Sequence, residues 1–259
     1  MKKDKKFIIS IDQGTTSSRA ILFDLKGQPV YSSQKEFTQY FPKSGWVEHD
    51  PEEIWSTTKK TLKDVINKCK KLKGKILTIG ITNQRETTVL WDKKTGKAVY
   101  NAIVWQDRRQ EEFCKKLRKQ NNETLIFNRT GLLIDSYFSG IKIKWVLDNV
   151  PLAKKLMSNR QLLFGTIDSF LIWRLTKSKV HATDATNASR TMIYNIVSNK
   201  WDDTILKLLK IEKHILPNVK DCADDYGYTD SSITGRPISI TGVVGDQQSA
   251  SIGQCCFEP

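Results

Sequence analysis

Four segments of the sequence hold the side chains that could perform chemistry, and each lies beside a short apolar run. The first, Asp12–Arg19, reads Asp-Gln-Gly-Thr-Thr-Ser-Ser-Arg between two apolar stretches. Gly14 allows backbone conformations that other residues resist, and neighbouring hydroxyl and backbone N–H groups can cradle phosphate oxygens. Arg19 can donate two hydrogen bonds to a phosphate, and Asp12 can hold Mg²⁺. No Gly-Lys-Ser/Thr follows, so this is not a Walker A loop, and an ordinary hairpin turn is the alternative.

The second segment, 79–87, is an apolar strand that opens into Asn-Gln-Arg-Glu. Arg85 and Glu86 have two interpretations. They can form an ordinary surface ion pair. Alternatively, both face a cleft, where a donating guanidinium and an accepting carboxylate together fix a vicinal diol.

The third and fourth segments, 101–109 and 242–248, each contain one residue with two interpretations. Trp105 ends an apolar run, so it is either a core residue or a wall against the carbon face of a polyol. Asp246 follows a buried strand on a glycine-flanked turn, where open α/β sheets place reactive groups. It is either a helix cap or a general base that takes the proton from an attacking hydroxyl.

The elements that must position these segments indicate an α/β domain. Three apolar runs, at 7–11, 20–23 and 30–37, have connections too short for parallel crossovers, so these strands are antiparallel. Asp50 and Pro51 predict a helix start, which Glu53 would complete as a capping box. Further helices are predicted at 108–119, 139–149, 152–158, 167–175 and 249–254, and further strands at 76–81, 88–91 and 238–244. The result is a mixed sheet flanked by helices.

Composition excludes several functional classes. No apolar run among the 259 residues approaches the roughly 20 needed to span a bilayer, and no secretory signal is evident, so we expect no membrane partner and a cytoplasmic protein. Five cysteines and three histidines lack metal-ligand spacing. The formal net charge is +14, and its densest lysine cluster lies at 59–75. Without arginine forks or aromatic platforms, that cluster predicts a solvated helix face and no nucleic-acid partner.

With these segments described, the chain resembles the FGGY carbohydrate-kinase family. The resemblance is carried by SIDQGTTSSR at 10–19, GWVEHDP at 45–51, GITNQRETT at 80–88, YNAIVW at 100–105, YFSGIKIKWVLDN at 137–149, LFGTID at 163–168, TDATNASRTM at 183–192 and GVVGDQQ at 242–248. It implies a ribonuclease H-like or actin-like ATPase domain. Within the family it points to the members that transfer the γ-phosphoryl of ATP to glycerol.

The resemblance also implies roles for individual residues. Asp12 would organise Mg²⁺, while the nucleotide phosphates of ATP would contact Thr15, Thr16, Ser17 and Arg19. Glycerol would be bound by Arg85, Glu86, Trp105, Tyr137, Asp246 and Gln247, with Asp246 as the general base. The Arg85–Glu86 pair and Trp105 favour glycerol over larger sugars.

The resemblance further predicts that residues 1–259 form an N-terminal domain, with 246–259 approaching a hinge and the adenine pocket lying in a C-terminal domain outside this chain. Members of the family often form homodimers or tetramers. A regulatory loop near Thr229–Pro237 is shorter here, so sugar-phosphate inhibition is not expected. Two alternatives to a glycerol-phosphorylating enzyme stay open: a polyol-binding module with little or no turnover, and a family kinase acting on another sugar or polyol.

Overall fold

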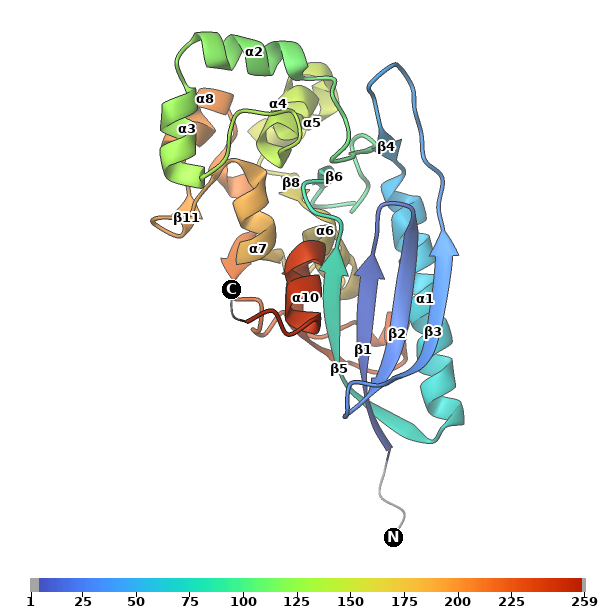
Figure 1. The fold of residues 1–259 in the computed structure, drawn as a ribbon. Helices are drawn as coiled ribbons and strands as arrows, with labels where there is room; N and C mark the ends of the chain where they lie inside the picture. The colour runs from blue at the N-terminus through green and yellow to red at the C-terminus, as the bar shows by residue number, and fades with distance from the viewer. Residues whose placement is uncertain (1–4, 258–259) are drawn as a thin grey trace.

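The computed structural model describes residues 5–257, which are built around a five-stranded sheet of order β13-β5-β1-β2-β3 (Figure 1). The strands are β1 (Lys5–Gln13), β2 (Ser17–Asp24), β3 (Pro29–Glu36), β5 (Gly74–Asn83) and β13 (Ser239–Gly245). β1, β2 and β3 form an antiparallel meander, whereas β5 and β13 run parallel to β1. The predicted mixed sheet with three antiparallel strands first is therefore confirmed.

One face of this sheet is much better covered than the other. Along β1 the side chains of Phe7, Ile9 and Ile11 are buried, and the residues between them are half-buried. This period of two is the signature of a strand with one face on the core. The buried face packs against α1 (Pro51–Lys71) and the apolar helix α6 (Ile167–Leu175). β3 is exposed along most of its length and forms an edge of the sheet.

Helix α1 starts as predicted. The Asp50 carboxylate accepts a hydrogen bond from the Glu52 N–H at 2.8 Å, and Pro51 occupies the first turn. The capping box, however, is not formed by Glu53, whose carboxylate instead accepts a hydrogen bond from Thr38 Oγ1 at 3.1 Å. The hydrogen bond from Thr38, a loop residue, thus takes the place of the capping contact that the local sequence predicts for Glu53.

A second buried cluster lies among helices above the sheet (Figure 1). It includes residues of α2 (Glu111–Lys119), α3 (Glu123–Thr130), α4 (Ser139–Asn149), α5 (Pro151–Ser158), β8 (Leu162–Gly165) and α8 (Asp203–Leu209). The predicted bounds of α4 and α6 are confirmed. α2 begins three residues later than predicted, because Arg109 is bound to Asp107 and Glu48 at 2.8 and 2.7 Å before the helix starts.

Short elements complete the described part of the chain. They are β4 (Glu48–His49) paired with β7 (Ala102–Ile103), β6 (Val89–Asp92) paired with β8, β9 (Ala182–Asp184) paired with β12 (Asn218–Lys220), β10 (Tyr194–Asn195) paired with β11 (Lys200–Trp201), α7 (Ala185–Ala188), η1 (Ser189–Thr191), η2 (Lys213–Ile215), α9 (Ser231–Thr234) and α10 (Asp246–Gly253). Across residues 5–257, no helix combines the length and the apolar character that crossing a bilayer requires.

Candidate active site

Three parallel strands end at the same level of the sheet, and this brings distant segments together. In the strand register, Asn83 at the end of β5 lies opposite both Gln13 of β1 and Gly245 of β13. The pairing continues past the strands, since the Gln84 N–H donates to the Gln13 carbonyl at 2.8 Å. Polar residues that follow β1, β5 and β13 therefore meet at one edge, the position where ligands bind in open α/β sheets.

Arg85 and Glu86 are both buried at this edge, with 6% and 1% of their surface exposed. The interpretation as a surface ion pair is therefore wrong. Each side chain has its own partner. Arg85 Nε lies 3.2 Å from Asp246 Oδ1, and its Nη1 donates to Gln248 Oε1 at 3.1 Å. The Glu86 carboxylate accepts a hydrogen bond from Arg190 Nε at 2.7 Å.

The backbone of Glu86 is held in a conformation that non-glycine residues rarely adopt, with φ of 59°. Its carbonyl oxygen accepts hydrogen bonds from Thr88 Oγ1 and Ser139 Oγ, both at 3.1 Å, and from Lys142 Nζ at 3.4 Å. Burial raises the pKa of the Glu86 carboxyl, and the hydrogen bond from Arg190 opposes this rise. Burial also disfavours the charged form of Lys142. It lowers the pKa of this residue to about 7, while the nearby Glu86 carboxylate acts to raise it. Such strain and desolvation are typical of functional sites.

Trp105 and Tyr137 form an aromatic wall beside these charged groups. Their ring centroids lie 5.7 Å apart at an interplanar angle of 60°. Trp105 is half-buried and belongs to neither of the two buried clusters, so its interpretation as a core residue is wrong. Its indole Nε1 donates to Thr15 Oγ1 at 3.0 Å, which joins the aromatic wall to the first predicted segment. Burial raises the pKa of the Tyr137 phenol.

The segment Asp12–Arg19 forms the hairpin between β1 and β2. Across it, Arg19 Nε donates to Asp12 Oδ2 at 3.1 Å, and both side chains are partly exposed. The expectation for Gly14 is wrong, because its φ is not in the left-handed region and an added Cβ would meet only the Ser17 carbonyl at 3.5 Å. Thr15 accepts the hydrogen bond from Trp105, and Ser17 Oγ accepts one from Gln34 Nε2 at 2.9 Å.

A magnesium ion would find few protein ligands here. The part of the chain described by the structure contains no group of three or more His, Cys, Asp or Glu side chains placed to hold a metal. Asp12 offers one partly exposed carboxylate near the end of β1, where it pairs with Arg19. That donor set fits Mg²⁺, which is commonly bound through one or two carboxylates, several waters and substrate phosphates.

Asp246 is the first residue of α10, which starts three residues earlier than predicted. Its side chain is 47% exposed, so one side of the carboxylate is open while the other faces Arg85. Gln247 is exposed, and the following residue, Gln248, makes the contact with Arg85. Two residues of the candidate site, Gln248 and Arg190, were not predicted. A signal existed for both, because Arg190 lies in TDATNASRTM and Gln248 in GVVGDQQ, two of the stretches that carry the resemblance.

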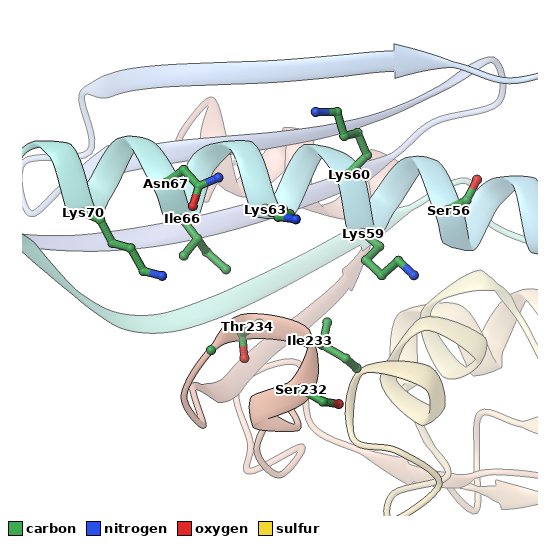
Figure 2. Close-up of a pocket in the computed structure, with 11 residues that line it drawn as sticks. Ser56, Lys59, Lys60, Lys63, Ile66, Asn67, Lys70, Ser232, Ile233 and Thr234 are labelled. Carbon is green, nitrogen blue, oxygen red and sulfur yellow. The ribbon is translucent and has the colours of Figure 1, made fainter.

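The lysine-rich cluster lies elsewhere. Figure 2 shows Lys59 and Lys70 of α1 pointing towards a groove against α9, with Ser232, Ile233 and Thr234 on the other side, whereas the Lys60 side chain points away from α9. Lys60 and Lys63 also belong to the lining of the groove. The groove has a volume of about 520 Å³, and none of its lining residues belongs to the four polar segments. The four lysines are exposed, as predicted for a solvated helix face.

Comparison with known proteins decides the family. The sequence profile of the N-terminal domain of the FGGY family of carbohydrate kinases matches residues 7–253. This chain belongs to that family. The chain is similar to a glycerol kinase of Sinorhizobium fredii, with 58% identity over 253 residues, and to one of Alkaliphilus metalliredigens, with 56% identity over 256 residues. It covers 51% of each relative, so the chain spans about half the length of the curated proteins that it matches.

Solved structures give the same result. A crystal structure of Plasmodium falciparum glycerol kinase with ADP superposes with a TM-score of 0.94 at 39% identity, over 98% of this chain and 51% of that one. A gluconate kinase from Lactobacillus acidophilus superposes with a TM-score of 0.85 at 26% identity, over 96% of this chain and 50% of that one. The predicted actin-like ATPase fold of the family is thereby confirmed.

Proposed function

We propose that the protein to which this chain belongs is an ATP-dependent glycerol kinase. In this proposal the chain supplies the polyol pocket, a phosphate-binding hairpin and the general base. The observation that carries the proposal is the buried Arg85–Glu86 segment, placed between an aromatic wall and the half-exposed Asp246. The glycerol kinases that are more than half identical to this chain support the choice of substrate.

The proposed pocket binds a small polyol through a hydrogen-bond donor, a hydrogen-bond acceptor and two aromatic rings. Arg85 donates to one hydroxyl and Glu86 accepts from its neighbour, while the rings of Trp105 and Tyr137 face the carbon skeleton. The hydroxyl left over lies beside Asp246, which accepts its proton as the oxygen attacks the γ-phosphorus. Arg85 keeps the Asp246 carboxylate oriented through the contact of 3.2 Å between Nε and Oδ1. Gln247, adjacent on α10, belongs to the same proposed pocket.

The hairpin provides the phosphate side of the reaction. Thr15, Thr16, Ser17 and Arg19 would bind the nucleotide phosphates, and Asp12 would hold Mg²⁺, which supplies positive charge against the charge developing on the phosphoryl oxygens. Since phosphoryl transfer demands little covalent chemistry from the protein, positioning and electrostatic stabilisation carry most of the catalysis. We further propose that this chain is the N-terminal domain, with residues 246–259 leading to the hinge.

One experiment separates this function from its alternatives. ADP release is measured with glycerol, xylulose and gluconate as acceptors, and glycerol binding to this chain is measured by calorimetry. Turnover with glycerol well above the other two acceptors is expected. Turnover on xylulose or gluconate alone would favour a kinase for another sugar. Glycerol binding to this chain without turnover by the protein would favour a non-catalytic polyol-binding module.

A further inference from the structure

The segment Asp184–Arg190 contacts the ends of β5 and β13, the two strands that lead into Arg85 and Asp246. Thr186 Oγ1 accepts a hydrogen bond from the Gly245 N–H at 2.8 Å, next to Asp246. Asn187 and Asn83 exchange two amide hydrogen bonds, at 3.0 and 3.1 Å, just before Gln84 and Arg85. α7 packs against β13, the strand that leads into α10. One short segment thus links the ends of β5 and β13.

Arg190, the last residue of this segment, lies on η1, and its side chain contacts Glu86 in the pocket. Its Nε donates to Glu86 Oε1 at 2.7 Å, and its guanidinium carbon lies 5.0 Å from the ring centroid of Phe138 and 5.8 Å from that of Tyr137. The Arg190 side chain is 27% exposed and that of Glu86 is 2% exposed. Arg190 therefore lies between solvent and the buried carboxylate, stacked on the aromatic wall.

We infer that Arg190 is a positioning residue of the polyol pocket, which holds the Glu86 carboxylate as a hydrogen-bond acceptor facing the ligand. The inference deepens the proposed function and rests on it for the identity of the ligand. Its chemical basis is that an ionised carboxylate only accepts hydrogen bonds, whereas a protonated one must also donate. The ionised form can accept on both oxygens, and its charge-assisted hydrogen bond from a polyol hydroxyl is the stronger one.

Other charged groups near Glu86 are already engaged. Arg85 faces Asp246 and Gln248, and the Lys142 ammonium donates to the backbone carbonyls of Tyr137 and Glu86. The nearby Tyr137 phenol and Asp246 carboxylate carry no compensating positive charge. Within residues 5–257, Arg190 is the residue whose side chain donates a hydrogen bond to the Glu86 carboxylate. Burial raises the pKa of Glu86, and among the opposing influences Arg190 has the largest effect.

The decisive test is a titration of the Glu86 carboxyl carbon by NMR, with the signal assigned by its loss in Glu86→Gln. Glu86 is expected to titrate at higher pH in Arg190→Gln than in the wild type, and at an intermediate pH in Arg190→Lys, which keeps the charge but loses the planar donor. Arg118→Gln is the matched control, since Arg118 pairs with Glu111 at 2.8 Å in α2. An unchanged Glu86 titration in Arg190→Gln would overturn the inference. If that variant does not fold, an unchanged titration in Arg190→Lys would overturn it as well.

Glycerol affinity provides the second readout. Arg190→Gln is expected to weaken binding roughly ten- to a hundredfold, as for loss of a hydrogen bond to a charged group. Binding should weaken further on acidification, and this loss should set in at a higher pH in Arg190→Gln than in the wild type. Affinity and pH profile equal to the wild type would count against Arg190. A wild-type chain that binds no glycerol would instead refute the proposed function, while the carboxyl titration still decides the role of Arg190.

Discussion

The polyol pocket and the phosphate hairpin lie at the same edge of the sheet but are built very differently. In the pocket, Arg85 and Glu86 are buried, and each has fixed partners from segments far away in the sequence. In the hairpin, Asp12 and Arg19 are partly exposed and bind each other. The pocket is organised before any ligand arrives, whereas the hairpin must exchange its internal ion pair for contacts with the nucleotide.

The pocket and the hairpin also differ in what they contribute to the free energy of folding. The left-handed backbone of Glu86 and the desolvated charges of Glu86 and Lys142 all cost folding free energy. An exposed ion pair such as Asp12–Arg19 contributes little in either direction. Substitutions in the pocket should therefore affect both binding and stability, and substitutions in the hairpin should affect binding alone.

The largest effect is expected at Asp246, the proposed general base of the pocket. An Asn side chain cannot take up the proton, so Asp246→Asn should lower the turnover number by about 10²–10⁴-fold, the usual contribution of general-base catalysis. KM for glycerol should change much less, because the amide oxygen still faces Arg85. Steady-state ADP release at saturating glycerol measures both quantities.

Asp230→Asn is the matched control for this variant. Asp230 caps the short helix α9 by accepting from the Ser232 N–H at 2.9 Å, and Asn caps helices equally well. Turnover should equal that of the wild type. Full turnover in Asp246→Asn would refute the assignment of the general base.

The next largest effect is expected at Gly245, which tests how tightly the pocket is built. An added Cβ would lie 2.5 Å from Arg85 Cδ and 2.9 Å from Cγ, so Gly245→Ala must displace the Arg85 side chain. We expect a loss of about 1–3 kcal/mol in the free energy of unfolding, as for other overpacked sites, and about tenfold weaker glycerol binding. Urea denaturation and calorimetry measure these changes.

Gly253, the last residue of α10, provides the comparison. A Cβ added there meets no atom within 4 Å, so Gly253→Ala should leave glycerol affinity unchanged and stability unchanged or slightly higher. Equal effects of the two substitutions would show that Arg85 has room to move. The pocket would then not be as rigid as the comparison with the hairpin implies.

A smaller effect, dependent on pH, is expected at Asp168 below the pocket. Asp168 is fully buried and accepts hydrogen bonds from Thr166 and Thr183 hydroxyls at 2.5 and 2.6 Å. Burial, with the nearby Asp184, raises its pKa from 3.8 to about 7. Between these values the folded state binds a proton that the unfolded state does not, so the contribution of Asp168 to stability falls as pH rises towards 7.

Two histidines, the buried His49 and the half-buried His181, act in the opposite direction. Burial lowers the pKa of His49 and of His181 to about 4, and stability from these groups rises with pH. The contribution of Asp168 is therefore measured as the difference between Asp168→Asn and the wild type. This difference should shift in favour of the variant by about 2–3 kcal/mol between pH 5 and pH 8 in urea denaturation. A difference independent of pH would contradict the raised pKa.

The sequence predicted part of the candidate site. Arg85 and Asp246 were each placed after a strand, and the resemblance to the FGGY family placed both in one pocket. Their contact follows from the structure, in which the parallel strands β5 and β13 end at one edge. Arg190 and Gln248 were not predicted. Their partners lie 104 and 163 residues away in the sequence, and no local spacing records such contacts.

Errors at element boundaries have similar causes. α10 begins at Asp246 because an acidic residue in the first turn suits the helix N-terminus, which the predicted start at Ser249 did not take into account. α2 begins later than predicted because Arg109 pairs with Glu48, a residue of the distant strand β4. Local patterns locate the elements well. Tertiary contacts decide where they begin and what their side chains bind.

The smallest effect on stability is expected for Arg19→Gln, and this makes it the sharpest test of the comparison. The Asp12–Arg19 pair is partly exposed, so its loss should change the free energy of unfolding by less than about 1 kcal/mol. Binding of MgATP should still weaken, because a donor to the phosphates is lost. Lys60→Gln, which removes the exposed pair with Asp64 at 3.1 Å, should show the same small change in stability and unchanged nucleotide binding. A loss of several kcal/mol in Arg19→Gln would mean that the hairpin, like the polyol pocket, is held rigid before its ligand binds.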